Sequence, residues 1–159
     1  MSGLLNERFN VVPQIEAASA TTYSVSDTTT TLDVTLSSVE VPAKPPPGLT
    51  YRYKLGGTKT GANGVMQVKL TLGGTAICTL EAPGNDAVDW IAEFTVRFTN
   101  AKAQRVMGCL VSNGIAAVVD YAAGTVDCTP SVVLKAQIYS AHASDTVTCN
   151  LATVERWVK

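Results

Sequence analysis

The fold class follows from the alternation in one segment, Trp90-Ile-Ala-Glu-Phe-Thr-Val-Arg-Phe-Thr-Asn100. From Trp90 to Phe98 every second residue is apolar, and Glu93, Thr95 and Arg97 fill positions between them. Successive side chains on a β-strand point to opposite faces of a sheet, so this spacing builds one apolar face and one polar face. The same residues at helical spacing would scatter around the axis, so the stretch predicts a half-buried β-strand.

The preceding segment has the same pattern and ends in a turn. Val68, Leu70 and Leu72 alternate with polar residues, and Gly73-Gly74 follows at once. Glycine readily adopts the positive φ angles of a two-residue hairpin, so the next strand should return along the first. Three antiparallel strands that share one apolar face are the start of an all-β domain.

Alternating segments recur along the rest of the chain, at residues 32–36, 49–55, 105–111, 115–121, 132–138 and 147–151. Turn residues separate them, and the glycine-rich stretch 56–64 is interpreted as a hairpin connection. A bulge or a strand end is expected near Thr153, because Val154 and Trp157 lie on the opposite parity from the residues before them.

These eight or nine short strands, with no helical pattern, predict an all-β fold. Specifically, we expect a single-domain jelly-roll β-sandwich of about 8–9 antiparallel strands over residues 30–159, preceded by an extended N-terminal arm. The seven-stranded immunoglobulin class is the competitor. It is weakened by the absence of a Cys…Trp…Cys spacing.

The composition of the chain argues against several classes of function. The chain has 159 residues, 46% of them hydrophobic, which suits one domain with a buried core. The formal net charge is −1 and no basic stripe is present, so we expect no nucleic-acid binding. No apolar run reaches the length of about 20 residues of a membrane helix, so no membrane partner is expected. The first ten residues lack the features of a signal peptide, and we expect synthesis in a cytoplasm without secretion.

Candidate catalytic and metal-binding residues are few. Four cysteines lack the close spacing of a zinc or redox site and are expected to be reduced, mostly buried thiols. Oxygen ligands between Glu81 and Asp89 could hold calcium, but their spacing matches no EF-hand loop. His142 could form a triad with Asp145 and a serine, yet no G-x-S-x-G elbow occurs. We therefore predict no enzyme, no metal and no cofactor.

Residues 1–29 form the predicted arm, and its part from Ala17 onward is poor in large side chains. Such a segment buries too little surface to offset its own ordering entropy. We expect it to contact a neighbouring subunit or another partner through its apolar residues, which are Leu4, Leu5, Phe9, Val11, Val12 and Ile15. The alternative is an arm that packs back onto its own domain.

The order of features carries a family resemblance. A polar arm and a proline-glycine turn precede Gly48-Leu-Thr-Tyr-Arg-Tyr-Lys-Leu-Gly-Gly57, then Lys69-Leu-Thr-Leu-Gly-Gly-Thr-Ala-Ile77, the strand that Trp90 begins, and Lys135-Ala-Gln-Ile-Tyr-Ser140. Over residues 32–157 this order resembles the small jelly-roll structural proteins of tailed bacteriophages, which include capsid decoration proteins and tail or fibre components.

The resemblance implies a non-enzymatic protein of the virion. Its partner would be the major capsid protein or another virion protein, and it would form a symmetric homo-oligomer, with a trimer favoured. One alternative is a carbohydrate-binding receptor module of a tail fibre or spike, whose candidate aromatic residues are Tyr51, Tyr53, Tyr121, Tyr139 and Trp157. Another is a hydrolase that uses His142.

Overall fold

The computed structural model describes residues 14–19, 23–25, 32–33, 38–61, 64–82, 88–112 and 115–158, and these form β-strands and turns without a helix. The strands are β1 (Gln14–Ser19), β2 (Tyr23–Val25), β3 (Leu32–Asp33), β4 (Val39–Val41), β5 (Thr50–Thr60), β6 (Met66–Leu72), β7 (Thr75–Ala82), β8 (Val88–Asn100), β9 (Ala103–Ser112), β10 (Ile115–Gly124), β11 (Val132–Ser140) and β12 (Thr146–Trp157).

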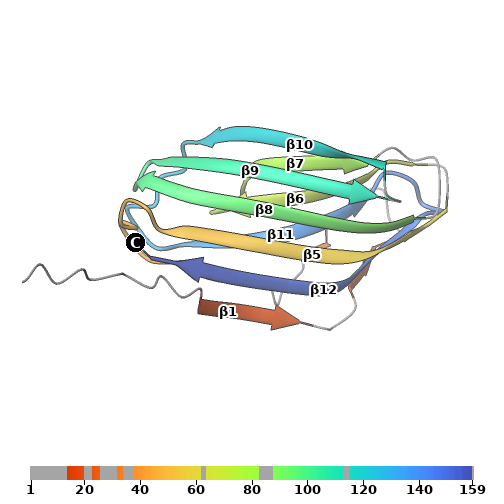
Figure 1. Ribbon diagram of the computed structural model, residues 1–159, viewed down its shortest axis with the longest axis horizontal. Coiled ribbons are helices and arrows are strands. Elements are labelled where there is room, and N and C mark those ends of the chain that lie inside the picture. Colours follow the sequence, from red (N-terminus) through yellow and green to blue (C-terminus); the bar gives the residue numbers. More distant parts are fainter. Residues whose placement is uncertain are drawn as a thin grey trace, which may run out of the picture.

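Two antiparallel sheets lie face to face (Figure 1). The seven-stranded sheet has the order β1-β12-β5-β8-β9-β10, and β2 also pairs with β12. The five-stranded sheet has the order β3-β11-β6-β7, and β4 also pairs with β11. The prediction of an all-β sandwich is confirmed, and the strands from β4 to β12 match the expected number.

The chain path between the sheets is that of a jelly roll. It passes from β4 in the smaller sheet to β5 in the larger one, back to the β6–β7 hairpin, and over again to β8. Later, β11 returns to the smaller sheet and β12 to the larger one. A β-sandwich whose chain crosses between its two sheets in this way is a jelly roll. The β9–β10 hairpin extends one edge of the larger sheet.

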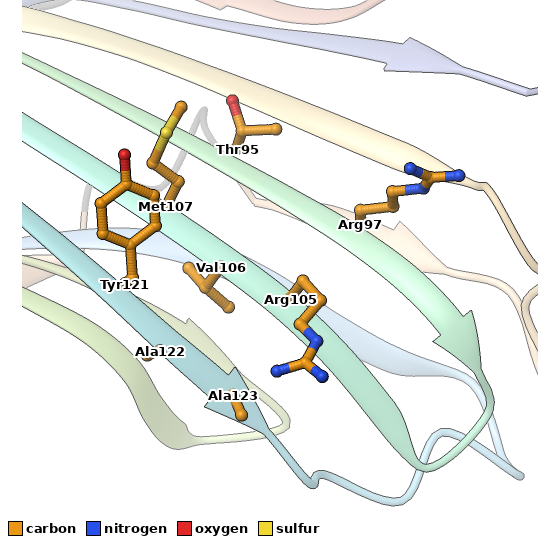
Figure 2. Close-up of a pocket in the computed structure, with 8 residues that line it drawn as sticks. All are labelled: Thr95, Arg97, Arg105, Val106, Met107, Tyr121, Ala122 and Ala123. Atoms are coloured by element: carbon orange, nitrogen blue, oxygen red, sulfur yellow. The ribbon is translucent and has the colours of Figure 1, made fainter.

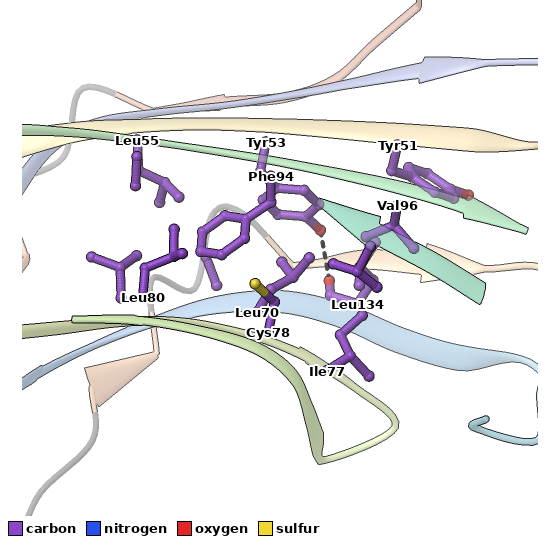
Figure 3. Packing of buried hydrophobic residues seen from close by; sticks show 14 of the residues in the cluster. Tyr51, Tyr53, Leu55, Leu70, Ile77, Cys78, Leu80, Phe94, Val96 and Leu134 are labelled. Carbon is purple, nitrogen blue, oxygen red and sulfur yellow. Dashed lines mark hydrogen bonds between the residues drawn. The ribbon is translucent and has the colours of Figure 1, made fainter. Parts of the chain in front are cut away.

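The core lies between the inner faces of the two sheets. Trp90, Phe94 and Phe98 of β8 are buried, as their spacing predicts. Tyr53 donates a hydrogen bond of 2.9 Å from its hydroxyl to the carbonyl oxygen of Leu134 in the opposite sheet (Figure 3). Burial, and secondarily the nearby Tyr51, raise the pKa of Tyr53 well above its usual range, so this hydroxyl stays a donor.

The β6–β7 hairpin confirms the turn predicted at Gly73-Gly74. Both residues have positive φ angles, of 56° and 81°. Two consecutive positive values at the centre of a two-residue loop match the twist of the flanking strands. A residue with a Cβ atom would be strained at either position.

The glycine-rich stretch 56–64 does not form the predicted hairpin. Instead β5 runs through Gly56 and Gly57 to Thr60, and the chain then crosses to β6 in the other sheet. A Cβ atom on Gly57 would lie 1.8 Å from the carbonyl oxygen of Thr148. Close approach of two backbones, and not a turn, therefore requires glycine at this position.

The bulge predicted near Thr153 lies earlier in β12, between Cys149 and Leu151. Cys149 pairs with Gly57 and Leu151 with Gly56, so Asn150 is the extra residue. The bulge keeps Cys149 and Ala152 on the buried face while Leu151 points outward.

Two segments of the predicted arm belong to the larger sheet. β1 and β2 both pair with β12 in an antiparallel manner. These segments thus take the alternative arrangement, in which the chain packs back onto its own domain. The division at residue 29 between an arm and a domain stays a prediction.

A buried ion pair joins β5 to the turn before β12 at one end of the sandwich. Lys59 near the end of β5 and Asp145 before β12 approach within 3.0 Å, and both side chains are fully buried. The Lys59 ammonium also donates to the carbonyl oxygen of Gly61 at 2.7 Å, and the Asp145 carboxylate accepts from the backbone N–H of Gly64 at 2.8 Å. These extra hydrogen bonds offset the loss of water around both charges.

Replacement of one partner should destabilise the protein strongly, because the other charge would stay buried without its counter-ion. We expect Lys59→Met to lower the free energy of unfolding by about 3–5 kcal/mol in urea denaturation. The double variant Lys59→Met/Asp145→Leu should recover much of this loss. Lys54→Met removes a half-buried lysine from the same strand and should cost about 1 kcal/mol or less. A similar effect of Lys59→Met and Lys54→Met would contradict the assignment.

Candidate functional site

Most of the predicted partner-binding residues lie outside the part of the chain that the structure describes. These are Leu4, Leu5, Phe9, Val11 and Val12. The sixth, Ile15, lies in β1 at the edge of the larger sheet, and 70% of it is exposed. An exposed isoleucine on an edge strand is available for contact with another protein.

The turn that holds His142 does not have the arrangement of a catalytic triad. His142 Nδ1 lies 2.8 Å from the hydroxyl of Ser144, and that hydroxyl lies 3.4 Å from Asp145 Oδ1. In a triad the histidine stands between the serine and the carboxylate, whereas here the serine stands between the other two. Asp145 already binds Lys59 and the Gly64 N–H. These contacts therefore shape the turn and join it to β5.

Metal-binding and membrane-spanning features were also sought. Among the described residues no three histidine, cysteine or acidic side chains gather closely enough to hold a metal ion. Asn85 and Asp86, two of the possible calcium ligands, lie outside those residues. Within the same residues no helix is long and apolar enough to cross a membrane.

The outer face of the larger sheet carries most of the large apolar side chains that are exposed. Leu151 pairs with Gly56, Gly56 with Ile91, and Ile91 with Val111. We call Leu151, Ile91 and Val111 the apolar row, because the pairing aligns them across β12, β5, β8 and β9. Leu151 is 53% exposed and Ile91 is 60% exposed.

A shallow groove of about 540 Å³ lies farther along the same strands. We call it the arginine groove, and its main lining residues are Thr95 and Arg97 of β8, Arg105 and Met107 of β9, and Tyr121 of β10. Figure 2 shows Tyr121 and Met107 side by side, with Arg97 and Arg105 on neighbouring strands nearby. Arg97 and Arg105 face each other directly in the register of β8 and β9.

The five aromatic candidates for a sugar site have different surroundings. Tyr51 and Tyr53 belong to the buried core. The ring of Tyr139 packs against the ammonium group of Lys69, 5.2 Å from its centroid, and Trp157 is half-buried. Tyr121 is 75% exposed and borders the arginine groove.

The arginines of this groove were not singled out from the sequence. Strand alternation places Arg97 on the polar face of β8, but it cannot show which residue of another strand lies opposite. That pairing depends on the length of the turn between β8 and β9, which begins beyond Asn100. The sequence therefore contains part of the information, because it predicts outward-facing arginines on two adjacent strands. It does not predict that they lie opposite each other.

The cysteines are free, and three of the four are buried, as predicted. Cys109 is half-buried in β9, where it pairs with Glu93 on the outer face. Burial, followed by the charge and hydrogen bond of Asp120, raises the pKa of Cys78 from 9.0 to about 12. Burial also raises the pKa values of Cys128 and Cys149. The thiolate is the reactive form, so these three thiols should be inert.

A thiol-reactive aromatic disulfide should therefore label Cys109 first in the folded protein. Between pH 7 and pH 9 Cys78 stays a thiol, because its pKa of about 12 lies well above this window. We expect one fast phase in absorbance, and the remaining thiols should react only in denaturant. Cys109→Ser should remove the fast phase and Cys128→Ser should retain it. A fast phase that survives in Cys109→Ser would show that another thiol is accessible.

Comparison with known proteins does not assign the chain to a family. No protein-family model matches it, and no curated protein matches it significantly.

Proposed function

We propose that the protein is a non-enzymatic structural component of a bacteriophage virion. In this proposal it is a capsid decoration protein that binds the major capsid protein, or another virion protein, as a symmetric oligomer. The resemblance of the sequence to small jelly-roll phage proteins supports the class of function. The exposed apolar residues on one face of the sandwich support assembly.

The main support for the proposal is that the apolar row and, separately, Ile15 are exposed on the outer face of the larger sheet. Ile15 pairs with Glu155, an outward residue of β12, so it lies on the same face as Leu151 but four residues farther along β12. Adjacent strands lie about 4.8 Å apart, so the apolar row alone extends over roughly 14 Å. Exposed apolar residues that gather on one face mark a protein contact more often than scattered ones do.

The rigid sandwich suits a protein that binds a partner and catalyses no reaction. β5, β8 and β9 are each paired on both sides, so their outward side chains have fixed positions before any partner binds. A rigid surface loses little conformational freedom on association, and affinity spread over a large area then suffices. Ile15 lies at the edge of the sheet, where the predicted arm would continue the contact with a subunit or the shell.

Lysine substitutions in the apolar row should prevent assembly and leave the fold intact. We expect the parent to have about three times the chain mass of 16.7 kDa in light scattering after size exclusion, and Ile91→Lys/Leu151→Lys to have the mass of one chain. Both positions are exposed, so the unfolding temperature of the monomer should change little.

The matched control lies on the other sheet. Val133 of β11 is 46% exposed and pairs with Glu40, so Val133→Lys places one positive charge on the opposite sheet, directly across from a carboxylate. This variant should keep the parent's mass. A parent with the mass of one chain at every concentration, both alone and when mixed with undecorated shells, would overturn the proposal.

One observation favours a second function, a carbohydrate-binding module of a tail fibre or spike. Of the five aromatic candidates, Tyr121 combines high exposure with a neighbouring groove. Sugar rings stack their apolar face on such an aromatic ring. The groove lies toward the opposite end of the strands from the apolar row, so both functions are compatible on one face.

A further inference from the structure

Arg97 and Arg105 lie directly opposite each other on β8 and β9. The residues that pair with them on the two outer sides are not acidic. Thr50 pairs with Arg97 on one side and Ala123 pairs with Arg105 on the other, so the row reads Thr50, Arg97, Arg105, Ala123. Like charges directly opposite each other on antiparallel strands are destabilising. Arg52, Lys59 and Lys102 form ion pairs in the part of the chain that the structure describes, and Arg97 and Arg105 take part in none of these three.

The next row along the strands supplies an apolar platform. Met107 pairs with Tyr121, two residues from Arg105 and Ala123. Residues two apart on a strand lie about 7 Å from each other on the same face. That spacing is close to the width of a six-membered ring with one substituent. A ring stacked on Tyr121 would therefore bring a substituent toward Arg105 on the adjacent strand. Arg97 lies one strand farther, and its side chain would have to turn toward Arg105 from the direction that Figure 2 shows.

We propose that the arginine groove binds a sugar that bears a carboxylate, such as a uronic acid. The Tyr121 ring stacks on the apolar face of the sugar, and Met107 flanks it. The guanidinium groups of Arg97 and Arg105 bind the carboxylate, whose two oxygens match the planar array of N–H donors on arginine. The hydroxyl of Thr95 borders the same groove and binds a sugar hydroxyl. The ligand class rests on the second function proposed above and is independent of assembly.

The shape of the groove favours a small acidic ring over an acidic peptide. Its volume of about 540 Å³ falls within the range of small-molecule sites. An extended peptide gains affinity from backbone hydrogen bonds to an open strand edge. Arg97 and Arg105 lie on β8 and β9, whose backbones are paired on both sides, so a peptide paired with the open edge at β10 would lie beside the arginines and not over them. A simple anion would use the arginines but would gain nothing from Tyr121 and Met107.

The test is a titration of the full chain followed by amide chemical shifts in low-salt buffer. The probes are glucuronate, glucose, acetate and a glutamate-rich peptide. We expect glucuronate to shift amides of β8, β9 and β10 and to bind at least tenfold more tightly than glucose or acetate. Salt should weaken this binding, because both arginines are exposed to solvent.

Single variants identify the groups that bind. Arg97→Gln, Arg105→Gln and Tyr121→Ala should each weaken glucuronate binding by roughly three- to tenfold, since all three side chains are exposed and partly screened. Lys54→Gln removes one positive charge from the same face outside the groove, and it should leave the affinity unchanged. All four positions are outward-facing, so the amide spectrum should show an intact fold.

The remaining outcomes contradict the proposal in distinct ways. Equal binding of glucose and glucuronate at Tyr121 would overturn the acid specificity but leave the carbohydrate-binding function standing. No binding of either sugar would overturn both. Acetate as tight as glucuronate would show a plain anion site, and a tighter peptide would show a protein partner. The oligomer mass, measured separately, reports on the structural role in every case.

Discussion

The two sheets pack their inner faces against each other, and this packing determines which side chains point outward. β5 lies inside the larger sheet, and its Tyr51, Tyr53 and Leu55 fill the space between the sheets. The hydrogen bond from Tyr53 to the Leu134 carbonyl satisfies a buried hydroxyl and joins the two layers at a defined point. Once these side chains point inward, strand geometry places their sequence neighbours on the outer face. The packing of the core therefore determines which residues the outer face presents.

The alternation in the sequence was sufficient to predict the sandwich but not its contacts. The residues from Trp90 to Phe98 predict β8 correctly, because a period of two is a local property. The Lys59–Asp145 pair joins residues far apart in the chain, and no local pattern reveals it. Gly57 was misinterpreted as part of a turn, since the Thr148 carbonyl that requires a glycine there becomes visible only when β5 and β12 are paired.

The outer face combines two kinds of chemistry at separate places. The apolar row places three exposed apolar side chains in line across four strands, which suits a lasting contact with another protein. The arginine groove concentrates positive charge in a chain whose net charge is −1, which suits a smaller and reversible ligand. A rigid sheet can hold both without coupling them, because each depends on outward side chains that the core does not use.

The bulge at Asn150 has a consequence for variation in the length of the chain. Loss of this one residue would leave Cys149 beside Gly57 and Leu151 beside Gly56, so the ladder would close without turning any side chain over. Loss of a residue between Ala152 and Val154 would exchange inside and outside for the rest of the strand. Homologous chains of this fold should therefore tolerate a gap at position 150 and resist one a few positions later.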